Sequence, residues 1–213
     1  MLFRSVGIRP NGLAYDPARN LLLVANVGDP SRPGSFTVSI VDVGTKTMIA
    51  DVSVAGRTRW AMFDTEVDRF YVNIADPPEI VGVAAVEPFR VARAFSISSA
   101  GPHGLDLDRE QARLFCACDG GKLFSLDARS GNMLSESDLT GVPDVVFFNA
   151  GLKRLYVAIG DPGVIDVFDT ESMRRSETVR TERGAHTIGF DAARNTVYAF
   201  LPGSHRAAVY VDE

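Results

Sequence analysis

Apolar and polar positions along this chain follow one pattern five times over. In each copy a short apolar run ends at an acidic or amide residue and a turn, and a second run, often with an aromatic residue, begins six or seven residues later. The anchor residues are Asp16, Asp64, Asp108, Asn149 and Asp191, and the steps between them are 48, 44, 41 and 42 residues. Repeats of this length indicate stacked structural units that share one continuous core.

The fourth copy shows the unit most clearly, with strand-like runs at residues 145–148, 155–158, 164–168 and 176–181. The first run is continuously apolar, which predicts a strand covered on both faces, and the last is polar, which predicts an outer strand. No segment has the sustained 3.6-residue period of a helix. The sequence therefore predicts an all-β fold, a β-propeller of about five four-stranded antiparallel blades. The blade repeats begin near residues 11, 59, 103, 144 and 186 of a single domain that spans residues 1–213.

Both ends of the chain fall inside a blade. Residues 207–212 form a third strand with no fourth strand after it, while residues 2–7 precede the first innermost strand, where an outer strand is expected. In a closed five-bladed ring these two segments would complete one sheet and remove its exposed edges. An arc of a larger ring would start and stop at the same points of the repeat, so the pattern alone leaves both arrangements open.

Residues 9–26 resemble the repeat of the YVTN family of β-propellers, in which Pro-x-Gly, an apolar residue and Ala precede Asp-Pro and then Leu-Tyr-Val-(Ala/Thr)-Asn. The stretches Arg-Phe-Tyr-Val-Asn (69–73) and Arg-Leu-Tyr-Val-Ala (154–158) resemble the part that names the family, and 38–42 and 165–169 resemble its third strand. The resemblance, to the YncE-like group, covers essentially the whole chain. That group usually forms seven-bladed rings and shares no catalytic motif. It therefore favours an arc that lacks about two blades over the closed five-bladed ring, and it implies no activity.

The composition of the chain limits the classes of partner that it is expected to bind. A net charge of -5 gives no general attraction to nucleic acid or to an anionic membrane, and no apolar run is long enough to span a bilayer. The first ten residues lack the apolar core of a signal peptide, which predicts a cytoplasmic protein, although a truncated start leaves a periplasmic or secreted location open. A complete chain is expected to be a monomer. Cys116 and Cys118 are interpreted as two small buried residues, because no further cysteine could complete a thiolate metal site.

One equivalent position, five residues before each anchor, is polar in all five repeats. In a propeller it lies where the chain enters the innermost strand, at the mouth of the central channel, where ligands bind. The residues at this position are Asn11, Arg59, His103, Asp144 and His186. We interpret them as candidate ligand-binding residues.

Three chemistries are open for this set of residues. We favour a hydrated polar rim or small-ligand contacts, which need no cofactor. Imidazole and carboxylate groups also suit a divalent metal, for which His103, Asp144 and His186 are the candidates, or acid–base catalysis by a histidine. The favoured function is therefore a non-enzymatic scaffold that binds a small molecule, peptide or protein at the channel face. The alternative is a metal-dependent enzyme, a lactonase-like hydrolase or a lyase.

Overall fold

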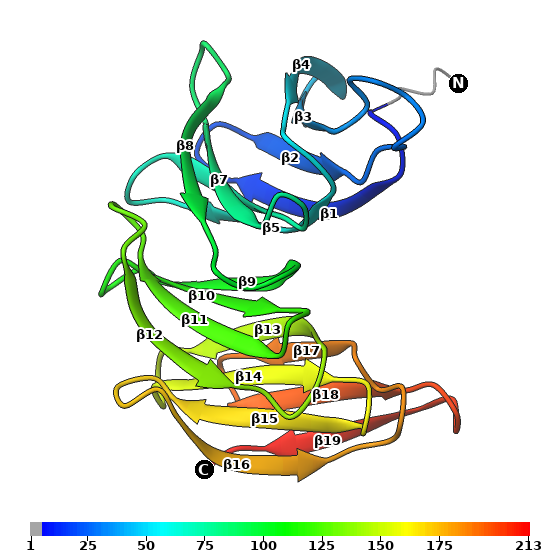
Figure 1. Ribbon diagram of the computed structural model, residues 1–213, viewed down its shortest axis with the longest axis vertical. Helices are drawn as coiled ribbons and strands as arrows, with labels where there is room; N and C mark the ends of the chain where they lie inside the picture. The colour runs from blue at the N-terminus through cyan, green and yellow to red at the C-terminus, as the bar shows by residue number, and fades with distance from the viewer. Residues whose placement is uncertain (1–5) are drawn as a thin grey trace. The chain divides into compact units, whose positions relative to one another are not determined.

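The computed structural model describes residues 6–213, and the regular structure in this part of the chain consists of nineteen β-strands (Figure 1). The first sheet contains β1 (Pro10–Asp16), β2 (Leu21–Asn26), β3 (Thr37–Asp42) and β4 (Thr47–Ser53). The second contains β5 (Thr58–Asp64), β6 (Arg69–Ile74), β7 (Glu79–Ala84) and β8 (Val91–Ser96). The third contains β9 (Pro102–Asp108), β10 (Arg113–Cys118), β11 (Lys122–Asp127) and β12 (Met133–Asp138). The fourth contains β13 (Pro143–Asn149), β14 (Arg154–Ile159), β15 (Val164–Asp169) and β16 (Arg174–Arg180), and the fifth contains β17 (Ile188–Asp191), β18 (Thr196–Leu201) and β19 (Arg206–Val211).

Strands that follow one another in the chain are hydrogen-bonded neighbours in every sheet and run antiparallel. This meander of sheets is the blade architecture of a β-propeller, and it confirms the predicted fold class. No helix of the described residues is long and apolar enough to cross a membrane. The chain divides into two compact units, Met1–Pro102 and His103–Glu213, called unit 1 and unit 2 below. The first two sheets belong to unit 1 and the other three to unit 2, apart from the first residue of β9.

The anchor residues close the turn that follows each innermost strand. Asp16 accepts hydrogen bonds from the backbone N–H groups of Ala18 and Arg19 at 2.9 and 3.2 Å. The side chain of Asn149 accepts the corresponding bonds from Gly151 and Leu152 at 3.0 and 3.2 Å. The same type of contact is made by Asp64, Asp108 and Asp191. An acidic or amide residue recurs here because its oxygen substitutes for a backbone carbonyl in the turn.

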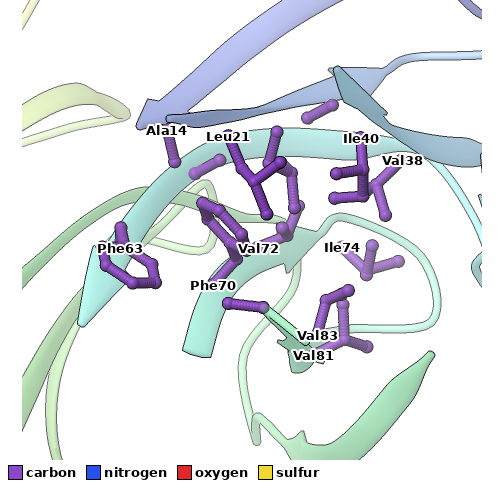
Figure 2. Packing of buried hydrophobic residues seen from close by; sticks show 14 residues of the cluster. Ala14, Leu21, Val38, Ile40, Phe63, Phe70, Val72, Ile74, Val81 and Val83 are labelled. Carbon is purple, nitrogen blue, oxygen red and sulfur yellow. The ribbon is translucent and has the colours of Figure 1, made fainter. Parts of the chain in front are cut away.

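Each unit has its own apolar core. In unit 1, one cluster joins the facing sides of the first two sheets, with Ile40, Phe70 and Val72 fully buried in it (Figure 2). In unit 2, Phe115 and Leu155 take the corresponding place between the third and fourth sheets. The second strands of the first four sheets are buried along almost their whole length, so their sequences are mostly apolar instead of alternating. In β18 of the fifth sheet, by contrast, Tyr198 and Phe200 are exposed. Cys116 and Cys118 are buried in β10, as predicted.

The strand predicted over residues 2–7 lies mainly outside the described residues, and Val6 and Gly7 are not in a strand. The N–H of Gly7 instead reaches Ser39 of β3 at 3.3 Å, and the carbonyls of Ile8 and Arg9 accept hydrogen bonds from the segment that follows β2. Within residues 6–213, β18 is the only strand that pairs with β19, so the fifth sheet has three strands here. Closure of the ring through a strand at 2–7 stays a prediction.

Candidate functional site

Three of the five predicted site positions, Asn11, Arg59 and Asp144, lie in β-bulges. In β1 the register shifts between Pro10 and Gly12, and the extra residue is Asn11. The same irregularity spans Arg59 in β5 and Asp144 in β13. A bulge leaves one residue out of the ladder and turns its side chain away from the regular alternation. This local geometry is why one position in each blade can present a polar group while its neighbours stay in the core.

In unit 2 the structure brings His103, Asp144 and His186 together. His103, near the start of β9, has its Nε2 3.2 Å from Oδ1 of Asp144 on β13. The other oxygen of Asp144 lies 3.7 Å from Nε2 of His186, which immediately precedes the fifth sheet. One carboxylate therefore lies between two imidazoles, and the three side chains come from three consecutive sheets.

A fourth residue completes the group. Nδ1 of His103 is 2.7 Å from Oδ1 of Asp119, in the turn after β10 of the same sheet. Both nitrogens of this imidazole thus face carboxylates, and both can donate hydrogen bonds only when the ring is doubly protonated. The side chain of His103 is 17% exposed, against 54% for His186, so the outer histidine is the more accessible one. We call Asp119, His103, Asp144 and His186 the His–Asp cluster.

One close backbone approach and one side-chain hydrogen bond fix the cluster. A Cβ atom on Gly104 would lie 2.4 Å from the carbonyl oxygen of Asp144, so β9 and β13 can come this close only with glycine there. The ring of His186 is held by its Nδ1, 2.7 Å from the carbonyl oxygen of Gly184. Because a carbonyl can only accept, Nδ1 carries a hydrogen, and Nε2 is the nitrogen on the side of Asp144.

Sequence reasoning did not identify Asp119, although a signal was available. Acidic residues follow the second strand in other repeats, at Asp29, Asp76 and Asp161, and each is followed by proline. Asp119 takes this place in the third repeat, where glycine follows it instead. Comparing the position itself, and not the Asp-Pro pair, would have placed a carboxylate near His103.

In unit 1 the two remaining predicted residues lie on adjacent innermost strands. Asn11 is exposed on β1, and Arg59 is half-buried on β5. A Cβ on Gly12 would lie 2.4 Å from the carbonyl oxygen of Arg59, so the two strands run in close contact at this point. Asn11 and Arg59 thus lie on neighbouring sheets, and their role in ligand binding stays a prediction.

The His–Asp cluster has hydrogen-bond distances between its members, and whether it binds a metal stays a prediction. Within residues 6–213, no group of three or more histidine, cysteine or acidic side chains has an arrangement that could hold a metal ion. Nε2 of His103 faces a carboxylate oxygen at hydrogen-bond distance, which occupies the nitrogen that a metal would need. His186 and Asp144 remain the two groups that could share an ion.

Comparison with known proteins supports the fold alone. No family model matches the chain, and no curated protein matches it. Among solved structures it is similar to hydrazine synthase of Kuenenia stuttgartiensis, with a TM-score of 0.64 and 13% sequence identity over 98% of this chain and 85% of that one. In all, 1601 chains of solved structures match, so this architecture is widely shared. At such low identity the likeness agrees with the β-propeller fold and carries no activity over, and membership of the YVTN family is not confirmed.

Proposed function

We propose that this chain is a non-enzymatic β-propeller scaffold of the YVTN type, which binds a small molecule, peptide or protein at the face that carries the His–Asp cluster. The observation that carries the proposal is the continuous contact from Asp119 through His103 and Asp144 to His186. It joins three sheets through side chains that leave a half-exposed imidazole and two partly exposed carboxylates at the surface. Such a fixed array of donors and acceptors suits recognition of a polar ligand.

The arrangement argues against a catalytic histidine at position 103. A general base needs one nitrogen directed at the substrate, but both nitrogens of His103 are directed at protein carboxylates. The accessible group is Nε2 of His186, which a ligand donor could reach beside Asp144. We therefore place the recognition step at His186 and Asp144, with His103 and Asp119 holding Asp144 in position.

The proposal is tested by ligand-observed NMR with a fragment library that contains cations, anions, neutral polar molecules and short peptides. Wild-type protein is compared with the His186→Ala/Asp144→Asn double variant, and a His205→Ala variant serves as the matched control. We expect fragments that bind wild type and the control but not the double variant. If every fragment that binds does so equally well to all three proteins, this face is not the binding site.

A metal-dependent enzyme remains the second candidate because of one observation. The Nδ1 hydrogen bond of His186 fixes the tautomer whose Nε2 can bind a metal, and a carboxylate oxygen lies 3.7 Å away. Elemental analysis of purified protein decides between the two candidates. One equivalent of a transition metal that the His103→Ala/His186→Ala variant loses would support the enzyme, whereas equal metal content in both proteins would rule it out.

A further inference from the structure

A second candidate site lies in unit 1 and shares no residue with the His–Asp cluster. A cavity of about 560 Å³ opens where the chain enters β1 and β5 and where β2 and β6 end. Two arginines, Arg9 and Arg57, and one acid, Asp76, line it together with an apolar wall that includes Phe36, Pro30 and Pro77. Neither Asn11 nor Arg59 contributes to this lining. We propose that this cavity binds a small organic anion, an apolar body that carries a carboxylate or a phosphate.

The two guanidinium groups supply the anion-binding part. Within the described chain, neither Arg9 nor Arg57 has a side-chain hydrogen bond or an ion pair, although most other arginines near an acid do. Guanidinium presents parallel N–H donors that match the two oxygens of a carboxylate or phosphate. Two such groups beside one cavity, in a protein of net charge -5, form a local concentration of positive charge.

Backbone hydrogen bonds hold both arginines at the cavity. The carbonyl of Arg9 accepts a hydrogen bond from the N–H of Val27 at 3.0 Å, and the carbonyl of Arg57 accepts one from Ala75 at 2.8 Å. A Cβ on Gly56 would lie 1.8 Å from the carbonyl oxygen of Asp76, so the two loops are packed backbone to backbone. The Cα positions of the arginines are therefore set before a ligand arrives, which lowers the entropic cost of binding.

Within residues 6–213 the nearby acids form no ion pair with either arginine, although Arg9 is close enough to Asp29 to help lower the pKa of that carboxyl. The carboxylate of Asp29 accepts hydrogen bonds from the N–H and hydroxyl of Ser31 at 2.9 and 2.8 Å. These bonds, with smaller contributions from Arg32 and Arg9, lower the pKa of Asp29. Asp76 is the single acid in the cavity lining, and it makes no ion pair with either arginine in residues 6–213. Two positive charges against one negative charge favour an anionic ligand.

The apolar wall of the cavity indicates that the part of the ligand beyond its anionic group is apolar. Gly28 has a φ of +76°, and a Cβ there would lie 2.5 Å from Cδ1 of Phe36, so the aromatic ring packs directly on this backbone. Pro30 and Pro77 add rigid apolar surface, and the volume is within the range of pockets that hold small molecules. An inorganic ion would leave this surface uncovered, whereas an aromatic or aliphatic acid would cover it.

The test is calorimetric titration of the whole chain with three probes of similar size, namely phenylacetate, phenyl phosphate and benzylamine. Wild type is compared with Arg9→Gln, Arg57→Gln and the double variant, and Arg93→Gln on β8 provides a control with the same charge change in the same unit. We expect one or both anions to bind, benzylamine not to bind, and each cavity variant to weaken binding about tenfold through loss of a charge-assisted contact. Phe36→Ala should weaken the aromatic probes but leave any binding of inorganic phosphate unchanged.

The results of this titration distinguish a carboxylate ligand from a phosphate ligand, and they distinguish this cavity from the His–Asp cluster. Preference for phenyl phosphate would assign a phosphate ligand, and preference for phenylacetate a carboxylate. Both arginines are exposed, so the variants should melt as wild type does, and retained binding in His186→Ala/Asp144→Asn would show that this site is independent of the His–Asp cluster. The inference is overturned if neither anion binds the wild-type protein at concentrations on the order of 10 mM. It is also overturned if Arg93→Gln weakens binding as much as the cavity variants do.

Discussion

The two units present opposite chemistry at the same edge of the same kind of sheet. Where the chain enters the innermost strands, unit 1 carries Asn11 and Arg59 and unit 2 carries Asp144 and His186. Two residues earlier, unit 1 has the arginines of the cavity, Arg9 and Arg57, and unit 2 has Val142 and Gly184. The bulge that presents these residues is the same in β1, β5 and β13. The blade thus supplies a constant frame, and under the two proposals above single residues at its entry loops decide what each unit binds.

The largest losses of stability should come from substitutions in the apolar core between neighbouring sheets, a feature that both units have. Phe70 in β6 and Phe115 in β10 are fully buried and pack on Phe63 and Phe148, with ring centroids 4.7 and 5.3 Å apart. Replacement of either by alanine leaves a cavity and should cost about 3–5 kcal/mol in the free energy of unfolding. Urea denaturation measures the loss, with the exposed Leu134→Ala as control. A loss below roughly 1 kcal/mol in one unit alone would show that the two cores are not equivalent.

A second comparison concerns polar residues inside the sheets. Asp166 of β15 is fully buried and accepts hydrogen bonds from the N–H and hydroxyl of Thr140, from Thr178 and from Arg175. The equivalent residue of β3, three positions before the last residue of the strand, is Ser39, which bonds to Asn26 and Asp51.

Removal of the Asp166 carboxylate should lower the free energy of unfolding more than removal of the Ser39 hydroxyl. Asp166→Ala leaves several donors and one guanidinium without their acceptor, for an expected cost of about 3 kcal/mol, whereas Ser39→Ala should cost about 1 kcal/mol. Thermal and urea unfolding of both variants test this order. Equal losses would mean that the buried charge adds nothing beyond its hydrogen bonds.

A third difference should appear as a dependence on pH. Asp106 of β9 accepts hydrogen bonds from the N–H groups of Phe148 and Leu107 at 2.6 and 2.8 Å, but burial dominates and raises its pKa from 3.8 to about 6. Unit 1 has Ala14 and Met62 at the equivalent positions.

The folded state therefore holds a proton on Asp106 that the unfolded chain releases at lower pH. Its contribution to stability is complete below about pH 3.8 and is lost as the pH rises toward 6, because ionisation is then penalised only in the folded state. Asp106→Asn cannot ionise, so its melting temperature relative to wild type should rise between pH 4 and pH 7. A constant difference over this range would mean that Asp106 titrates normally.

The repeat alone was enough to predict the architecture. Five anchors at similar spacing, each followed by a second apolar run, predicted four-stranded antiparallel blades in which the first run is covered on both faces. Strand limits were less accurate. The outer strand of the fourth sheet was predicted over residues 176–181 and runs from Arg174 to Arg180, since polar outer strands have no apolar pattern to mark their ends.

The sequence predicted which positions of the repeat form the candidate site, but it did not predict every contact among the side chains. Equivalence within the repeat identified His103, Asp144 and His186, but the contact of His103 with Asp119 depends on a turn that comes close only in three dimensions. The cavity of unit 1 was missed for the same reason. Arg9, Phe36, Arg57 and Asp76 lie on four separate segments, and neither their spacing nor their types mark them as neighbours in the sequence.

The smallest predicted effect concerns ion pairs that join neighbouring sheets in each unit. Arg19, in the turn after β1, lies 2.7 Å from Asp68 in the turn after β5, and Lys153 lies 3.0 Å from Glu110 in the equivalent turns of unit 2. These groups are exposed at the surface, where side-chain entropy and screening offset most of the attraction. Asp68→Asn and Glu110→Gln should therefore lower the melting temperature only slightly. The small loss should vanish near 1 M NaCl, where the Debye length is about 3 Å. If the loss in melting temperature persists at high salt in one variant alone, its ion pair acts through packing or hydrogen bonding. Neighbouring sheets would then be joined by different interactions in the two units.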